Sequence, residues 1–367
     1  MKAELFTPSN AFCSLPNREG GGRVFVSVII PIYRVEAFIE RCARSLMEQT
    51  LNEVEFIFVD DGSPDGSMEV LERVLKDYPQ RIGQVRIIHH EQNKGLPAAR
   101  NTGLAAATGE YIFHCDSDDY MERDALEAMY GKAKQQDADI VYTDWYLESS
   151  SLNPPVVGRT AVRRIRYMQC PAYDTPEAAL RGLLHGRMKF NVWNKLVKRE
   201  VYSDNENDNH NENGHGEING SFPAGHGMGE DMTMILLFAK ARRVAYLPKG
   251  TYHYMRQNEN AFTASHSGMT STQYDDLRFN AQRVIDALTG IVPEEDMACF
   301  KLNVKYPFLI SDRREDYERW QKWFPEANRY IASHRVSRRA RLLEHCARSH
   351  FYMPLRLHYH LLQRLQG

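Results

Sequence analysis

The chain has 367 residues, 43% of them hydrophobic, which is enough to bury one large core or two ordinary ones. Its 46 basic and 48 acidic residues leave a formal net charge of −2, so the composition gives no reason to expect nucleic acid as a partner. No apolar run approaches the roughly 18 residues of a membrane span, and the first residues lack the basic and apolar regions of a signal peptide.

The first half of the chain alternates between strand and helix patterns. Residues 24–33 are a nearly continuous β-branched run, typical of a strand buried on both faces, and residues 36–50 carry an apolar stripe on one helical face. The alternation continues with strands expected at 54–63, 85–90 and 110–115 and helices at 68–78 and 97–108. This order predicts a doubly wound, Rossmann-like α/β fold with a mostly parallel sheet and helices on both faces.

The second half begins with the same alternation and then changes. Residues 203–222 are rich in Asn and nearly free of apolar side chains, which predicts a disordered loop. Around this segment we expect helices at 122–136, 175–186 and 230–242, strands at 138–145 and 190–202, a pair of strands at 244–256, and helices from about residue 270 onward.

The carboxyl-terminal end is strongly basic. From Arg335 onward there are seven arginines and one acid, Glu344, interspersed with leucine and aromatic residues. Such a segment either lies on an anionic membrane surface or packs back on the protein as a solvated helical face. The six cysteines show neither paired nor zinc-like spacing. We therefore expect reduced thiols and a cytoplasmic protein, which in the first case is peripheral on the inner face of the membrane.

Three carboxylates follow the expected strand at 110–115. Asp116 and Asp118 flank one small residue, so both can reach a hard divalent cation, and Mg²⁺ or Mn²⁺ keeps further positions for water and phosphate oxygens. The plain alternative is that this sequence caps the next helix, because Asp and Ser favour that position and the helix dipole favours negative charge there. Asp119 can serve as such a cap even where the other two hold a cation.

A second acidic pair, Asp60 and Asp61, ends the expected strand at 54–63. The carboxyl ends of parallel strands meet at one edge of a sheet, where ligands bind, so we expect both acidic groups on one rim. Lys94 and Arg100 lie between the two groups in the sequence and can offer cations to phosphate or hydrogen bonds to ribose oxygens. The alternative for the pair is a local turn with a helix cap.

Five segments of the chain together carry a resemblance. They occur in the order VSVIIPIY, FIFVDDGSPDGS, NKGLPAARNTGLAAATGEYIFHCDSDD, VWNKLVKRE and GEDMTM, over residues 24 to 260 or about two thirds of the chain. This ordered set resembles glycosyltransferase family 2, of the bacterial inverting type. The resemblance implies a GT-A fold, a nucleoside-diphosphate sugar donor with a UDP-sugar favoured, and a divalent cation, Mn²⁺ or Mg²⁺. It also implies a glycan or lipid-linked acceptor and a role in surface polysaccharide or glycan biosynthesis.

The resemblance also implies roles for residues on the donor side. It places Pro31, Tyr33, Asp60 and Asp61 in the floor under the base and ribose, Arg100 near the nucleotide, and Asp116 and Asp118 in the D-x-D motif, with Asp118 favoured for direct metal contact.

On the acceptor side, Glu230 and Asp231 match the family's catalytic-base position, with Asp231 as the base. An acceptor hydroxyl must lose its proton as it attacks the anomeric carbon, and a carboxylate on a short turn can take it. The alternative is an acidic pair at a helix start, favoured by the dipole. Trp193 and Lys195 resemble the acceptor-side wall, with core packing as the alternative for Trp193. Arg256 stands where the family often keeps a cation facing phosphates or the acceptor.

These assignments divide the chain into domains. We expect a tail at 1–22, a catalytic domain at 23–262 with a nucleotide-binding half (23–125) and an acceptor half (126–262), and a helical region at 263–367. Two other functions stay open. A sugar-nucleotide-binding module without turnover would be expected to lack one of Asp60, Asp118 and Asp231. A nucleotidyltransferase would carry a glycine-rich phosphate loop after the first strand, where this chain has no glycine.

Overall fold

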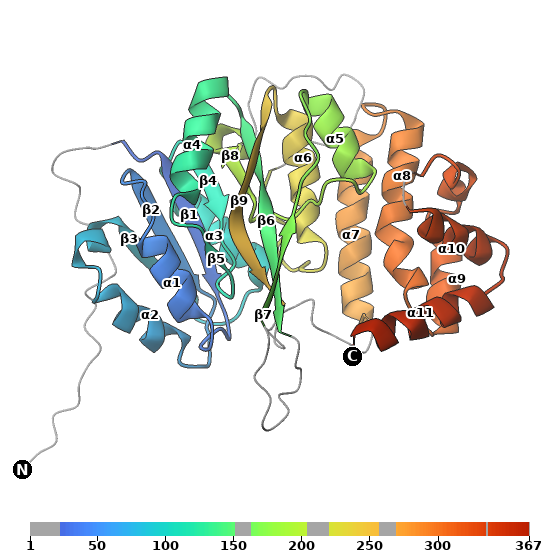
Figure 1. Ribbon diagram of the computed structural model, residues 1–367, viewed down its shortest axis with the longest axis horizontal. Helices are drawn as coiled ribbons and strands as arrows, with labels where there is room; N and C mark the ends of the chain where they lie inside the picture. The colour runs from blue at the N-terminus through green and yellow to red at the C-terminus, as the bar shows by residue number, and fades with distance from the viewer. Residues whose placement is uncertain (1–22, 151–162, 204–219, 257–268, 335–336, 367) are drawn as a thin grey trace, which may run out of the picture. The chain divides into compact units, whose positions relative to one another are not determined.

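The computed structural model describes residues 23–150, 163–203, 220–256, 269–334 and 337–366 (Figure 1). The expected tail at 1–22 and most of the expected loop at 203–222 lie outside these ranges. The chain divides into two compact units. The first combines Met1–Gln169, Val192–Glu200 and Leu247–Asn260, and the second combines Cys170–Asn191, Val201–Tyr246 and Ala261–Gly367. Residues 170–191 and 201–246, which we expected in the catalytic domain, therefore group with the carboxyl-terminal helices.

The amino-terminal half of the first unit is a parallel sheet. Strands β3 (Val85–His89), β2 (Val54–Asp60), β1 (Val26–Ile32) and β4 (Tyr111–His114) lie side by side in that order. Every residue of β1, β2 and β4 is buried, as their uninterrupted apolar runs predicted. Between the strands run α1 (Ile39–Met47), α2 (Ser67–Leu75), the 3₁₀-helix η1 (Pro79–Gln84) and α3 (Leu96–Ala106). The predicted alternation is confirmed.

The rest of the sheet pairs in the antiparallel sense. Strand β8 (Lys195–Lys198) pairs with β4 and with β6 (Ile140–Ser150), β7 (Arg163–Met168) pairs with β6, and β5 (Tyr120–Met121) pairs with β9 (Val244–Met255). The parallel arrangement that we predicted for most of the sheet thus holds for its amino-terminal half. Helix α4 (Ala125–Gln136) contacts β6, and the 3₁₀-helix η2 (Arg199–Tyr202) follows β8.

Strand β9 is a single strand where the sequence predicted a pair. The sequence Pro248-Lys249-Gly250 is typical of a turn, yet all three residues belong to the strand. A Cβ atom at Gly250 would lie 2.5 Å from the ring of Tyr146 on β6. The glycine therefore allows close packing between a strand and an aromatic ring, which is the other common use of glycine in a strand.

The second unit is helical. It contains α5 (Pro176–Leu184), the 3₁₀-helix η3 (Glu230–Met232), α6 (Thr233–Lys240), α7 (Ser271–Leu288), α8 (Glu294–Lys305), η4 (Tyr306–Leu309), α9 (Arg314–Lys322), η5 (Pro325–Tyr330), α10 (Arg338–Arg348) and α11 (Met353–Gln366). The predicted carboxyl-terminal helices are confirmed. Within the described ranges, none of the helices combines the length and the apolar character needed to cross a bilayer.

Candidate active site

The first unit gathers the predicted donor-side residues at one edge of its sheet. Strand β1 pairs with both β2 and β4, so the segments that follow these three strands emerge together. Tyr33 follows β1, Asp60 ends β2, and Asp116 lies two residues beyond β4. The expectation that the topology gathers the acidic groups on one rim is confirmed for this edge.

Arg100 and Asp116 form an ion pair on this rim. Arg100 lies on α3 and is 1% exposed, and its Nη2 donates to Oδ1 of Asp116 at 2.8 Å. The side chain of Asp116 is 25% exposed. The guanidinium therefore neutralises one carboxylate of the D-x-D motif from its buried side and fixes the position of that carboxylate.

Asp119 has a structural role that the sequence did not reveal. Its Oδ1 accepts a hydrogen bond from the backbone N–H of Met255 at 2.7 Å, and its Oδ2 accepts from the hydroxyl of Tyr252 at 2.8 Å. The alternative in which Asp119 caps the next helix is wrong, because α4 begins after Asp124 and Asp119 binds β9 instead. Complete burial, followed by the negative charges of Asp118 and Asp116, raises the pKa of Asp119 well above its ordinary value.

Asp61 clamps the loop that leads into α3. Its two carboxylate oxygens accept hydrogen bonds from the backbone N–H groups of Lys94 and Gly95, both at 2.8 Å, and Oδ1 also meets Nδ1 of His90 at 2.7 Å. Gly95 has a φ of +89°, which a glycine adopts without strain. The backbone of Lys94 is held in this way while its side chain is exposed on the rim.

Asp60 makes the local turn that we kept as its alternative. Its Oδ1 accepts from the backbone N–H of Ser63 at 2.9 Å, and its Oδ2 lies 2.9 Å from Nδ1 of His89. Beside it, Tyr33 is 39% exposed, and Arg34 lies over its ring at 5.3 Å with a φ of +54°. Tyr33 is thus partly exposed at the end of β1, with Arg34 over its ring, whereas Pro31 is buried within the strand.

The acceptor-side residues of the first unit are mostly buried. Trp193 is 6% exposed and stacks against Tyr252 at 4.7 Å and Tyr254 at 5.2 Å, so the core-packing alternative describes it best. Lys195 is 1% exposed, and its Nζ donates to Oδ1 of Asn194 at 2.8 Å. This burial is a correction to the expected wall, because neither side chain presents much surface to an acceptor. Arg256 is exposed just beyond β9.

Sequence reasoning missed Arg41 on α1. Its Nη2 donates to the backbone carbonyl of Asp118 at 3.4 Å, and its guanidinium lies 4.5 Å from the ring centre of Tyr120. The only signal for Arg41 in the sequence is its position directly before Cys42, and Cys42 lies on the packed face of the helix. Cys42 itself lies 3.9 Å from Cys115, the residue before the D-x-D motif.

Glu230 and Asp231 belong to the second unit. They form η3, which begins after Gly229 in the left-handed conformation, with φ +81°. Glu230 is 4% exposed, and Asp231 is half-buried. Helix α7 holds the preceding loop: Nδ2 of Asn280 donates to the carbonyls of His226 at 3.1 Å and Met228 at 3.0 Å.

More of α7 contacts the same loop. Asp276 lies 3.1 Å from Nδ1 of His226, whose ring stacks on Phe279 at 3.8 Å. Arg283, one turn further along, donates to the carbonyl of Ser221 at 3.0 Å. These side chains share one face of α7, so a single helix face positions the segment that ends in Asp231.

The rim has the ligand chemistry for a divalent cation. Within the described ranges no group of three or more His, Cys, Asp or Glu side chains is arranged to hold a metal ion. Asp116 and Asp118 nevertheless supply the oxygen ligands that Mg²⁺ and Mn²⁺ prefer, and such ions keep positions for water and phosphate. The residues present therefore fit a cation.

Comparison with known proteins gives consistent results. Residues 27–185 match the family model described as Glycosyl transferase family 2. The chain is 35% identical over 241 residues to the uncharacterized glycosyltransferase EpsJ of Bacillus subtilis, a match that covers 65% of this chain and 62% of that protein. It is 28% identical over 297 residues to the cholesterol galactosyltransferase of Borreliella burgdorferi, covering 78% and 74% of the two chains.

Solved structures show the same fold. The crystal structure of S. aureus TarS 1–349 in complex with UDP-GlcNAc superimposes with a TM-score of 0.61, covering 93% of this chain and 92% of that chain. The sequence identity is 20%, so this likeness concerns the fold alone. It confirms the predicted α/β fold with a helical carboxyl-terminal region.

Proposed function

Since residues 27–185 match the model of glycosyl transferase family 2, we propose that the chain transfers a sugar from a nucleoside-diphosphate sugar to an acceptor hydroxyl with inversion. The observation that carries the proposal is the rim at the end of β4. There the buried Arg100 pairs with Asp116, and Asp118 follows one residue later. The donor is proposed to bind at this rim.

On the donor side, Tyr33 and Asp60 line the place for the base and ribose, and Lys94 offers an exposed cation. Asp61 supports them by fixing the loop through Lys94 and Gly95. We favour a UDP-sugar, because crystal structures of TarS, which shares this fold, are described with UDP and with UDP-GlcNAc.

Asp118, with Asp116 beside it, would hold the divalent cation. When bound, such an ion supplies positive charge that neutralises the diphosphate of the donor. The chain's own part is to orient the two carboxylates, which Arg100 does for Asp116 through its hydrogen bond of 2.8 Å. Arg41 adds a contact of 3.4 Å to the carbonyl of Asp118, so α1 and α3 both hold this turn.

Asp231 is the proposed base. In the transfer, the acceptor oxygen forms a bond to the anomeric carbon while the bond from that carbon to the diphosphate oxygen breaks, and the hydroxyl proton passes to the carboxylate of Asp231. Glu230 is buried next to it and belongs to the same turn. Arg256 is proposed to face the donor phosphates or the acceptor from the end of β9.

The acceptor is proposed to be a glycan or a lipid-linked glycan in surface polysaccharide biosynthesis. The similar proteins include the cholesterol galactosyltransferase and a poly(ribitol-phosphate) beta-glucosyltransferase of Bacillus spizizenii, whose names give cholesterol and poly(ribitol-phosphate) as acceptors. A cytoplasmic location with peripheral contact to the inner face of the membrane would place the enzyme beside such acceptors.

The test is a thermal-shift series with nucleotide sugars, followed by donor hydrolysis, each with and without Mn²⁺. We expect one nucleotide sugar to raise the melting temperature in a Mn²⁺-dependent way and to be slowly hydrolysed. Binding without any hydrolysis or transfer would favour a non-catalytic sugar-nucleotide-binding module. No shift with any nucleotide sugar would overturn the proposal.

A further inference from the structure

Helix α11 exposes large apolar side chains. Leu355 and His358 are buried and attach the helix to the rest of the second unit, where it contacts α10. Met353, Leu357 and Leu361, spaced four residues apart, are 66%, 69% and 46% exposed. Side chains at such spacing share one helical face. The three therefore form an outward-facing apolar stripe.

Exposed basic side chains lie on α11 and α10. Arg356 and His360 are exposed on the same outward side of α11, and the helix contains no acidic residue. The only acid of α10 is Glu344, which is buried, with its Oε1 2.7 Å from Nδ1 of His334. Arg338, Arg339 and Arg348 of α10 are exposed. The described outer surface of these two helices thus combines apolar and positive groups and carries no carboxylate.

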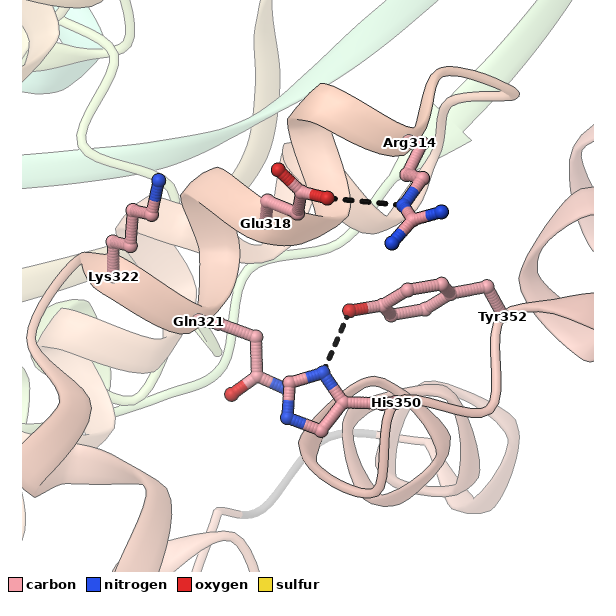
Figure 2. Close-up of a pocket in the computed structure, with 6 residues that line it drawn as sticks. All are labelled: Arg314, Glu318, Gln321, Lys322, His350 and Tyr352. Atoms are coloured by element: carbon pink, nitrogen blue, oxygen red, sulfur yellow. Dashed lines mark hydrogen bonds and ion pairs between the residues drawn. The ribbon is translucent and has the colours of Figure 1, made fainter.

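A recess lies where the stripe begins. Figure 2 shows side chains of α9 facing His350 and Tyr352, the residues just before α11, across a pocket of about 610 Å³. Arg314 and Lys322 contribute cations to this pocket, and Glu318 contributes one carboxylate, which Nε of Arg314 contacts at 3.0 Å. The pocket therefore adds net positive charge beside Met353.

We propose that the outward face of α11 docks on an anionic lipid bilayer. Met353, Leu357 and Leu361 would lie at the boundary between headgroups and acyl chains, with Arg356 and the cations of the recess among acidic headgroups. The inference deepens the membrane contact of the proposed function and names its residues. A second copy of the chain fits this face less well, because two such faces would bring like charges together.

Flotation of the full-length protein with vesicles tests the docking. We expect binding to phosphatidylcholine vesicles that contain phosphatidylglycerol, and loss of binding at high salt or with pure phosphatidylcholine. The variant with Met353→Ser, Leu357→Ser and Leu361→Ser should lower the ratio of bound to free protein at least about tenfold. Arg356→Glu should lower it on the order of tenfold.

Two matched substitutions serve as controls. Ile291→Ser removes an apolar side chain that is 53% exposed elsewhere in the second unit, and Arg278→Glu reverses an exposed charge on α7. Both should bind vesicles like the wild type. Equal binding by the triple variant and the wild type would overturn the proposal. Absence of wild-type flotation would also overturn it, and would leave an acidic protein as the partner of this face.

Donor hydrolysis in solution is measured on the same samples. Flotation without hydrolysis by the wild type would count against the proposed activity and leave the docking intact. Hydrolysis without flotation would count against the docking and leave the proposed activity intact. The two proposals can therefore fail separately. A melting temperature for each variant shows that a loss of binding does not come from unfolding.

Discussion

The buried guanidinium of Arg100 donates a hydrogen bond of 2.8 Å to Oδ1 of Asp116, the first carboxylate of the D-x-D motif. A buried charge is costly unless it is paired, so each partner depends on the other. The two residues are sixteen positions apart in the sequence, and their pair joins α3 to the segment after β4. Arg100 therefore holds Asp116, one of the proposed cation ligands, from the buried side of the site.

Replacement of Arg100 by Gln should destabilise the protein. The change leaves Asp116 without this cation next to Asp118, and because the side chain of Asp116 is 25% exposed, the loss of the pair should cost about 1–3 kcal/mol. The double variant Arg100→Gln, Asp116→Asn should recover part of this loss, because it removes the unpaired charge. Denaturant unfolding measures all three. Lys94→Gln, an exposed change on the same rim, is the control, and strict additivity of the two single changes would contradict the coupling.

Asp231→Asn tests the proposed base. The substitution removes the proton acceptor while keeping the size of the side chain, so transfer should fall about 10²–10⁴-fold. Donor affinity, measured by thermal shift with Mn²⁺, should stay nearly the same. Asp275→Asn, at an exposed acid of α7, should leave both quantities unchanged. Transfer by the Asp231→Asn variant within about tenfold of the wild type would mean that another group takes the proton.

Asn280→Ala tests whether α7 positions this base. Asn280 is fully buried and donates to the carbonyls of His226, Met228 and Asp276, at 3.0 to 3.1 Å. Its loss should lower the free energy of unfolding by about 1–3 kcal/mol and, in addition, lower kcat with little change in donor affinity. Arg278→Ala, on the exposed side of the same helix, is the control. A loss of stability with unchanged kcat would limit Asn280 to a structural role.

The sequence predicted those parts of the fold in which a residue pattern fits one kind of structural element. An uninterrupted β-branched run such as 24–33 fits a strand buried on both faces, and β1 is such a strand. The acidic residues after β2 and β4 could be placed on one rim, because parallel topology alone brings strand ends together.

The errors occur where a distant partner decides the role. Asp119 was a candidate helix cap, but its partners Tyr252 and Met255 lie 133 and 136 residues away on β9. Trp193 was a candidate wall, but aromatic rings from β6 and β9 enclose it. A sequence shows that an Asp or a Trp is present, and only the tertiary contacts decide between a functional surface and the core.

Lys305 provides a prediction about pH. Its side chain is fully buried, and Nζ donates to the carbonyl of Trp323 at 2.9 Å and to Oδ1 of Asn328 at 2.5 Å. Burial lowers the pKa of Lys305 from 10.5 to about 7 in the folded protein. Between these values the unfolded chain binds a proton that the folded chain has released, so this group makes the free energy of unfolding rise with pH.

The measurement compares the wild type with Lys305→Met by denaturant unfolding at several pH values. The stability of the wild type relative to the variant should increase by about 1.4 kcal/mol per pH unit between about pH 8 and about pH 9.5. Below about pH 7 both states of the wild type carry the proton, and the difference should level off. Lys322→Met, at an exposed lysine of α9, controls for the loss of a lysine. A flat difference across the window would show that Lys305 stays charged in the fold, held by Trp323, Asn328 and the ring of Trp320 at 4.1 Å.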